Sequence, residues 1–435
     1  ISPLIELITS GNDGTQIHAA STLATIAAAK PQYQDKCVDE GAITPLVTLL
    51  RMGSNKAMTY AAAAIYSLSA QHKHRAPLIK AGLVAPLVRL VRPDVTDDTH
   101  VHAAHAIAHV STENPAAQEA FYKAGAVPLL LELLHSGKAV DAAAMAVTKM
   151  LSPQHEHAPS APHIQGEVIK EGGIPPLLAL LSGISHAAQV HAAEAIANLA
   201  RGHAEAQALI AKAGGIGPLL AMLSSPRRQE QAEAAHALSE LTRTNADNQV
   251  HVARMGAIPL LVPLISNGDL HVREMVARAL AETCRANHAN QTAATDAGVL
   301  GSLIELLKGD RSPNQAGVSE EQQRLGEKVR AEAVGAIVAL SQGHEANQIA
   351  IAGSGGIAPT VQLLASGTKE AQAHAAEAVA SLGRGNVQNQ MEITKLLVNL
   401  LSMGSEVARA NATVALTRLV DENQASQHDM ARASE

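Results

Sequence analysis

The sequence predicts an all-α fold: a solenoid of about ten similar repeats, each containing three helices. A segment of the form Gly-apolar-apolar-x-Pro-Leu-x-x-Leu-Leu recurs along the 435 residues, most often 41 to 43 residues apart. A fixed period of about 20 to 50 residues is typical of a repeat architecture. The chain has no Trp, one Phe and four Tyr, although 47% of its residues are hydrophobic. Its core must therefore consist mainly of Ala, Leu, Ile and Val.

The repeats follow one another without a linker, so we expect a single domain over 1–435. They begin near residues 1, 41, 82, 125, 173, 215, 256, 298, 356 and 393. The first repeat lacks its own start, and we expect the chain to be part of a longer protein. The last repeat lacks its Gly, and residues 421–435 form a polar C-terminal tail.

Two insertions interrupt the period, at 153–165 and 310–328. Both are rich in Pro, Gly, Ser and Gln, which predicts loops, with one extra helical turn in 319–325. Insertions in surface loops cost little free energy, so these segments are either tolerated surface variation or part of a partner-binding surface.

Each repeat reads as three helices in a fixed order. The Pro-Leu segment begins a helix, because Pro at the first helical position loses no needed N–H, and a nearly continuous apolar pattern such as 177–181 predicts that it is buried. An Ala-rich segment such as 187–202 then places Ala192 and Leu199 on one stripe at helical spacing. A short helix such as 205–214 leads to the next Gly, where a left-handed residue ends one helix before a sharp turn.

The period, the three-helix repeat and the signature Gly…Pro-Leu-x-x-Leu-Leu…Ala-x-x-Ala-x-x-Asn-Leu resemble the armadillo repeat over essentially the whole chain. The resemblance implies a right-handed superhelix. In this arrangement the third helix of each repeat lines a long concave groove, and the first two helices form the convex side. Import adaptors of the importin-α type, catenins and vacuolar-type armadillo proteins are similar in fold. The fold serves many partners, so the resemblance implies protein binding without identifying the partner.

In the import adaptors and catenins, a ladder of side chains on the third helix reads an extended peptide. We align this ladder on Asn198 and define the ladder face as that position and the positions four and seven residues earlier in each repeat, which share one side of the helix. The import adaptors pair an Asn ladder with Trp four residues before it, whereas this chain has Asn once and no Trp. Catenins use basic ladder residues, and only Lys149 and Arg418 match. The chain therefore lacks both groove signatures.

The ladder face has a composition of its own. Seven histidines occupy its thirty positions, where a random share would be about 1.4, and the fifth to ninth repeats contribute six glutamates against one arginine. An acidic concave strip attracts a basic ligand. We predict that this face binds an extended, Lys- or Arg-containing protein segment, with affinity that falls as salt rises; an ordinary solvated helix face is the alternative. The residues expected to line the groove are His102, His105, His109, Lys149, His191, Glu194, Asn198, Glu233, His236, Glu240, Arg278, Glu282, Glu332, His374, Glu377, Ser381 and Arg418.

Three interpretations of the histidines remain open: ordinary hydrogen bonding, binding that depends on pH because unperturbed His titrates near ~6.5, and metal binding. His102, His105 and His109 share one helix face, but no fourth ligand for a structural zinc site lies close in the sequence. A second cluster occupies the first insertion: His155, His157 and His163. We predict no bound metal and no cofactor.

Several functional classes are not indicated. The sequence has no Gly-x-Ser-x-Gly elbow, no phosphate loop ending in Gly-Lys-Ser/Thr and no His-Glu-x-x-His helix, and Cys37 and Cys284 are expected to be small packing residues. A net charge of −7 argues against direct nucleic-acid binding. No apolar run approaches the ~18 residues of a membrane span. Two cysteines favour a reducing compartment, so we expect the cytoplasm or the nucleus.

These observations predict a non-enzymatic scaffold or adaptor that binds extended basic protein segments. Two alternatives belong to other functional classes. The first alternative is a structural element of a larger cytoskeletal or axonemal assembly, or a docking module of a multidomain protein. The second alternative is a receptor that carries basic cargo in nuclear import.

Overall fold

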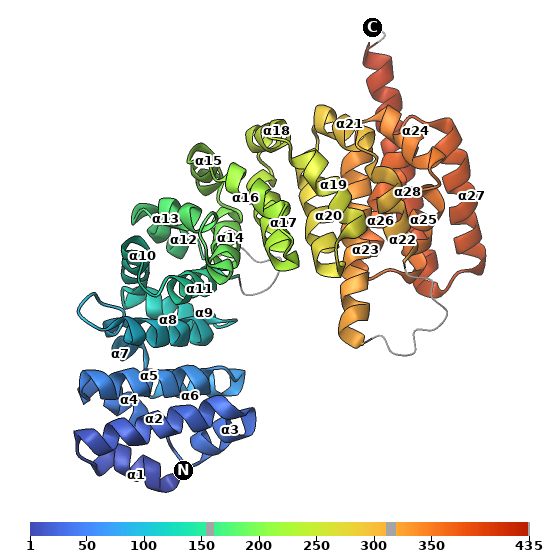
Figure 1. Cartoon of the computed structure of the whole chain (residues 1–435). Coiled ribbons are helices and arrows are strands. Elements are labelled where there is room, and N and C mark those ends of the chain that lie inside the picture. The colour runs from blue at the N-terminus through green and yellow to red at the C-terminus, as the bar shows by residue number, and fades with distance from the viewer. Residues whose placement is uncertain (154–160, 310–318, 434–435) are drawn as a thin grey trace. The chain divides into compact units, whose positions relative to one another are not determined.

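The computed structural model describes residues 1–153, 161–309 and 319–433 (Figure 1). Over these residues every regular element is a helix and there is no strand, which confirms the predicted all-α class. The chain divides into two compact units, the N-terminal unit Ile1–Ala213 and the C-terminal unit Gly214–Glu435. The single domain expected over 1–435 stays a prediction.

The N-terminal unit holds the helices α1 (Ser2–Ser10), α2 (Asp13–Ala29), α3 (Pro31–Asp39), α4 (Ile43–Met52), α5 (Asn55–Ser69), α6 (His72–Lys80), α7 (Val84–Arg89), α8 (Asp97–Ser111), α9 (Pro115–Lys123), α10 (Ala126–Ser136), α11 (Val140–Leu151), α12 (Pro162–Lys170), α13 (Ile174–Leu180), α14 (His186–Ala200) and α15 (Ala204–Lys212). The C-terminal unit holds α16 (Ile216–Leu223), α17 (Arg228–Thr242), α18 (Ala246–Arg254), α19 (Ala257–Asn267), α20 (Leu270–Cys284), α21 (His288–Asp296), α22 (Val299–Lys308), α23 (Glu320–Ser341), α24 (Glu345–Gly353), α25 (Ile357–Ser366), α26 (Lys369–Gly383), α27 (Val387–Met403) and α28 (Glu406–Ala433).

The third helices of successive repeats pack against one another within each unit. In the N-terminal unit α2, α5, α8, α11 and α14 contact each other in that order, and in the C-terminal unit α17, α20, α23, α26 and α28 do the same (Figure 1). Buried alanines occupy much of the contact surface, such as Ala277 and Ala279 of α20 and Ala333 and Ala336 of α23, each fully buried. Small side chains let the helix backbones approach closely, as the composition predicts.

In each repeat the short helix is the first, the Pro-Leu helix is the second and the Ala-rich helix is the third. Left-handed glycines separate the first helix from the second. Gly256 and Gly298 have φ of 89° and 84°, a conformation that strains any residue with a Cβ. Where two glycines adjoin, the prediction was one residue off: Gly172 is left-handed with φ of 71°, and Gly173 is right-handed. A Cβ on Gly173 would lie 2.7 Å from a methyl carbon of Val168. Close packing against Val168 therefore requires a glycine at this second position.

The proline lies deeper in the second helix than the first position assigned to it. Pro259, for example, is the third residue of α19. A proline at the third position still removes no hydrogen bond from the helix, because the first four N–H groups of a helix have no partner within it. In the last repeat, where the Gly is absent, the first and second helices are fused into the single helix α27. The expected polar tail at 421–435 instead continues α28 as far as Ala433.

The two insertions contain more helix than predicted. Helix α12 begins at Pro162 and α23 begins at Glu320, so 162–165 and 320–328 are helical. Ser319 and Gln322 form a reciprocal capping box at the start of α23, which satisfies two backbone N–H groups there. Residues 154–160 and 310–318 lie outside the described residues.

Buried amide side chains on the first helices join neighbouring repeats. Gln291 of α21 donates Nε2 to the carbonyls of Ala339 (2.7 Å) and Gln342 (3.1 Å) at the end of α23. Asn290 donates Nδ2 to the carbonyl of Thr283 (2.8 Å) at the end of α20 and to that of Gln249 (3.1 Å) on the preceding first helix. The last four carbonyls of a helix lack partners within it, so these amides satisfy groups that would otherwise be buried without a hydrogen bond. Equivalent donors are Gln118, Gln165, Asn248, Gln249, Asn347, Gln348 and Asn389.

Replacing one of these amides tests their contribution. Gln291→Ala removes two hydrogen bonds from a fully buried site, and we expect the free energy of unfolding to fall by about 1–3 kcal/mol. The matched control is Gln362→Ala on the exposed face of α25, which should stay within about 0.5 kcal/mol of the parent protein. Urea unfolding followed by circular dichroism measures both. Equal losses in the two variants would refute the proposed contribution of the buried amides.

Candidate functional site

The ladder face of the N-terminal unit is rich in imidazoles. His102, His105 and His109 lie on one side of α8, each partly exposed. Tyr66 of α5 packs against two of them, with ring centroids 5.0 Å from His105 and 4.7 Å from His109. Burial lowers the pKa of all three imidazoles below the ordinary value. They are therefore mostly uncharged near pH 7.

Next to this cluster, an ion pair joins two third helices. Lys149 Nζ of α11 lies 2.7 Å from Glu194 Oε1 of α14, and each side chain is about one-fifth exposed. His191 Nδ1 lies 4.0 Å from the other carboxylate oxygen of Glu194. Asn198 is 3% exposed and its amide donates to Ser152 Oγ at 3.4 Å. This asparagine is thus bonded inside the repeat stack.

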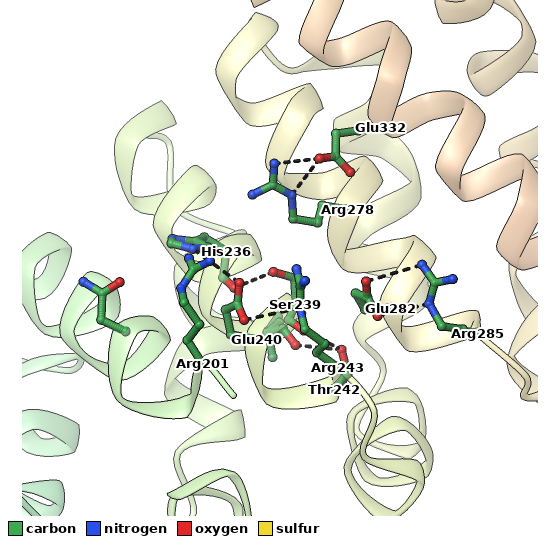
Figure 2. A network of polar contacts seen from close by, with 12 residues as sticks. Arg201, His236, Ser239, Glu240, Thr242, Arg243, Arg278, Glu282, Arg285 and Glu332 are labelled. Carbon is green, nitrogen blue, oxygen red and sulfur yellow. Dashed lines mark hydrogen bonds and ion pairs between the residues drawn. The ribbon is translucent and has the colours of Figure 1, made fainter. Parts of the chain in front are cut away.

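In the C-terminal unit a buried guanidinium joins α20 to α23 (Figure 2). Arg278 is 7% exposed, and its Nη2 and Nε lie 2.6 and 2.8 Å from Glu332 Oε1. Its Nη2 is also 3.6 Å from Glu274 Oε1, a carboxylate that is 2% exposed. Burial raises the pKa of Glu332, and Arg278 opposes that change. Arg278 and Glu332, both predicted to line the groove, instead stabilise the contact between α20 and α23 and present little charge to a ligand.

Two more ladder carboxylates are paired with arginines just beyond the same helix (Figure 2). Arg243 Nε lies 3.3 Å from Glu240 Oε2, and Arg285 Nε lies 3.2 Å from Glu282 Oε2. Glu240 is fully buried, and Glu282 is 8% exposed. These arginines stand outside the three aligned positions of the ladder face, so the alignment did not predict them. A signal was present, however, because arginine recurs three residues after the ladder position at Arg201, Arg243, Arg285 and Arg384.

Two other histidines of the ladder face lie in the C-terminal unit. His236 of α17 lies between two carboxylates on its own helix, with Nδ1 3.6 Å from Glu233 Oε2 and Nε2 4.0 Å from Glu240 Oε1. His374 of α26 faces α23, where its ring would lie 3.9 Å from a Cβ on Gly335. That distance is an ordinary van der Waals contact, so an alanine would fit at Gly335 beside the ring.

One pocket of the C-terminal unit brings three predicted site residues together. Its volume is about 550 Å³. Within the described residues, neither Glu377 nor Arg418 makes a hydrogen bond or ion pair. Ser381 Oγ lies 2.9 Å from Ser341 Oγ, with which it shares a hydrogen bond. The lining residues come from α23, α26, α28 and the turns after α23 and α26: Val338, Gln342, Gly343, Glu377, Ala380, Ser381, Arg384, Arg418 and Asp421.

Most carboxylates of the predicted acidic strip are paired with cations of the chain itself. Glu194, Glu240, Glu282 and Glu332 are each paired with a Lys or Arg of the chain. Two of these four counter-charges, Arg243 and Arg285, stand outside the ladder face, so a count along the ladder overstates its negative charge. Of the six glutamates, Glu377 is the one that lines the pocket.

The remaining residues of interest are the possible metal ligands, the histidines of the first insertion and the two cysteines. Among the described residues, no group of three His, Cys, Asp or Glu side chains is placed to hold a metal ion. His163 Nε2 lies 2.7 Å from Glu119 Oε2, whereas His155 and His157 lie outside the described residues. Both cysteines are buried, and burial raises the pKa of Cys284 to about 12, as suits a packing residue.

Over the part of the chain that the structure describes, no single helix combines the length and apolar character needed to cross a membrane. Three sharply bent pairs of consecutive helices meet that test of length and composition only when each pair is taken together.

The Arg278 contact gives a direct test of the network between third helices. Arg278→Met leaves Glu274 and Glu332 without their guanidinium, and we expect a loss of about 3–5 kcal/mol in unfolding free energy. Adding Glu274→Gln and Glu332→Gln should restore much of that loss, because the uncompensated carboxylates are then removed. Arg254→Met, at an exposed position on α18, is the control. Chemical denaturation of the parent, the two Arg278 variants and the control measures these unfolding free energies. A loss below about 1 kcal/mol in Arg278→Met alone would contradict the expectation.

Comparison with known proteins agrees with this architecture. The model of the armadillo/β-catenin-like repeat matches residues 162–201 and 245–285. No curated protein matches the chain. Among solved structures, an engineered protein studied by the Northeast Structural Genomics Consortium is 28% identical with a TM-score of 0.79, over 96% of this chain and 98% of that one. A designed armadillo repeat protein is also 28% identical, with a TM-score of 0.50 over 55% of this chain and 99% of that one. Taken with the recurring motif and the three-helix repeats, these matches show that the chain is a solenoid of armadillo repeats.

Proposed function

We propose that this chain is a non-enzymatic scaffold that binds an extended protein segment along its ladder face, with the pocket between α23, α26 and α28 holding a basic side chain of that segment. The armadillo fold is typical of protein-binding scaffolds. The observation that carries the proposal is the state of two charges in the pocket. Glu377 and Arg418 make no hydrogen bond or ion pair within the described residues, whereas most other ladder charges are already paired inside the chain.

The pocket sets the chemistry of the segment. Glu377 is partly buried, so a Lys or Arg side chain that reaches it forms an ion pair less screened by water than one on an open surface. Asp421 also lines the pocket and adds a second carboxylate, and Arg384 adds a guanidinium beside that of Arg418. Arg418 is exposed and suits an acidic side chain of the same segment. The proposal thus specifies where the predicted Lys- or Arg-containing segment places a basic side chain, namely at Glu377.

Polar neutral groups complete the pocket. Gln342 and Ser381 line it, and an amide and a hydroxyl both hydrogen-bond the backbone of an extended peptide. Among the described residues that line the pocket none is aromatic, and aromatic residues usually dominate binding hot spots. We therefore propose that affinity depends on a long segment contacting several repeats. The proposed compartment is the cytoplasm or the nucleus.

A peptide selection followed by charge exchange tests the proposal. Segments selected from a random peptide library on the whole chain should contain a Lys or Arg whose replacement by norleucine abolishes binding. Glu377→Gln should weaken the selected segment by at least about tenfold, or about 1.4 kcal/mol. Exchanging the charges, with Glu377→Lys in the chain and Lys→Glu in the peptide, should restore part of the affinity.

Isothermal titration at two salt concentrations provides the measurement, and affinity should fall as salt rises. The control is Glu345→Gln at an exposed position on α24, away from the ladder face, which should bind as the parent does. Selected segments that bind Glu377→Gln as tightly as the parent, or a selection that yields no segment, would overturn the proposed site.

A further inference from the structure

The histidines of the ladder face fall into two classes according to what surrounds them. His236 lies within 4.0 Å of two carboxylates on its own helix. In the N-terminal unit, His105 and His109 instead stack against the ring of Tyr66, and His102 lies on the same side of α8. His102 Nδ1 is buried without a hydrogen-bond partner among the described residues. This second group has little to stabilise a proton on its rings.

Burial is the largest influence that opposes protonation of the α8 histidines, and their neighbours act in both directions. His191 of α14 and His102 both disfavour a charge on His105, and Arg75 of α6 disfavours a charge on His109. Arg75 is held there because its guanidinium donates to the carbonyls of Ser69 (3.1 Å) and Thr112 (2.8 Å). Opposing these effects, Asp98 favours a charge on His102, and Asp141 and a hydrogen bond to the backbone of Val101 favour one on His105. A hydrogen bond that the His109 ring donates to the backbone of Tyr66 favours a charge on His109.

The remaining charges near α8 are engaged elsewhere. Lys149 and Glu194 neutralise each other. On α7, Arg89 donates to the carbonyls of Leu50 and Arg51 at the end of α4. Other titratable groups on or beside α8 have separate partners: Asp97 with His100 and Lys138, His74 with Asp35, and Glu119 with Lys123 and His163.

We propose that His102, His105, His109 and His191 form a proton-sensitive element that loosens the packing of α8 on its neighbouring third helices when the solution is acidified. Opening α8 frees the imidazoles from the Tyr66 ring, from burial and from one another. The opened state therefore binds protons that the packed state rejects. Among the described residues of the C-terminal unit, two imidazoles pack on each other, His288 and His344 with ring centroids 5.5 Å apart, and both stand at the start of first helices rather than on a third helix.

The direction of the pH dependence follows from linkage. In the opened state the imidazoles titrate near ~6.5, whereas burial holds the pKa of His102, His105 and His109 lower in the packed state. Above about pH 6.5 both states are neutral and packing is fully stable. Below that pH the opened state gains protons first, so stability falls with pH until the packed imidazoles also titrate. Each net proton gained on opening changes the opening equilibrium about tenfold per pH unit.

Hydrogen exchange on the whole chain measures this opening locally. After correction for intrinsic exchange rates, the protection factors of amides in α5 and α8 should fall at least about tenfold between pH 7.5 and 5.5. Those of α26, in the C-terminal unit, should change by less than about threefold over the same range. An equal loss of protection in α26 would overturn the proposal, because it would indicate a general effect of acid.

Two further measurements separate a proton-sensitive element from simple loss of packing. The double variant His105→Asn/His109→Asn should lose most of the pH dependence in α8, and His374→Asn on α26 should retain all of it. Proton NMR of the imidazole Cε1–H groups in the unmodified chain should show at least three histidines that titrate below ~6.5. Imidazoles that all titrate at or above that pH would refute the proposal, even where the double variant fails to fold.

Discussion

The structure depends on how it satisfies the free carbonyls at the ends of its third helices. These helices are mostly fifteen residues long and rich in alanine, and isolated helices of that length are marginal in water. They are stabilised by packing on one another, which buries the carbonyls at their C-terminal ends away from solvent. Amides such as Gln291 and Asn347 on the first helices donate to those carbonyls. Asn347 also donates to the backbone of Gln291 in the repeat before it, so one set of hydrogen bonds both ends the third helices and fixes the spacing of the repeats.

This spacing determines the charge of the ladder face. Because third helices of adjacent repeats are in contact, a ladder side chain reaches the next helix, as Lys149 reaches Glu194 and Arg278 reaches Glu332. The sequence predicted the all-α class, the three-helix repeat and most of the glycine turns, since each depends on local pattern. It also placed Glu377, Ser381 and Arg418 on one face, and they line one pocket. It did not predict the neutralising pairs, because Arg243 and Arg285 lie outside the aligned positions, and pairing depends on where long side chains point. The helical start of α23 was underestimated for a related reason: the capping box of Ser319 and Gln322 is a short signal within a segment of loop-like composition.

The location of the pocket follows from side-chain size. On α17 and α20 the ladder position and the position three residues later are Glu and Arg, and the pairs Glu240–Arg243 and Glu282–Arg285 fill the space beside the helix end. On α23 the same two positions are Ala339 and Gln342, which form no such pair. On α26 the ladder position is Ser381, a small side chain that is already bonded to Ser341. With no Glu–Arg pair at these ladder positions, a hollow of about 550 Å³ remains, and Glu377 and Arg418 line it. Enlarging Ala339 would disturb the packing of α23, because that residue is fully buried. The pocket is therefore a consequence of where this sequence stops repeating its own charge pattern: on α26 the arginine recurs as Arg384, which lines the pocket, but on α23 Gln342 replaces it. A ligand that places a cation beside α23 would take the position that Arg243 and Arg285 occupy in the two preceding repeats.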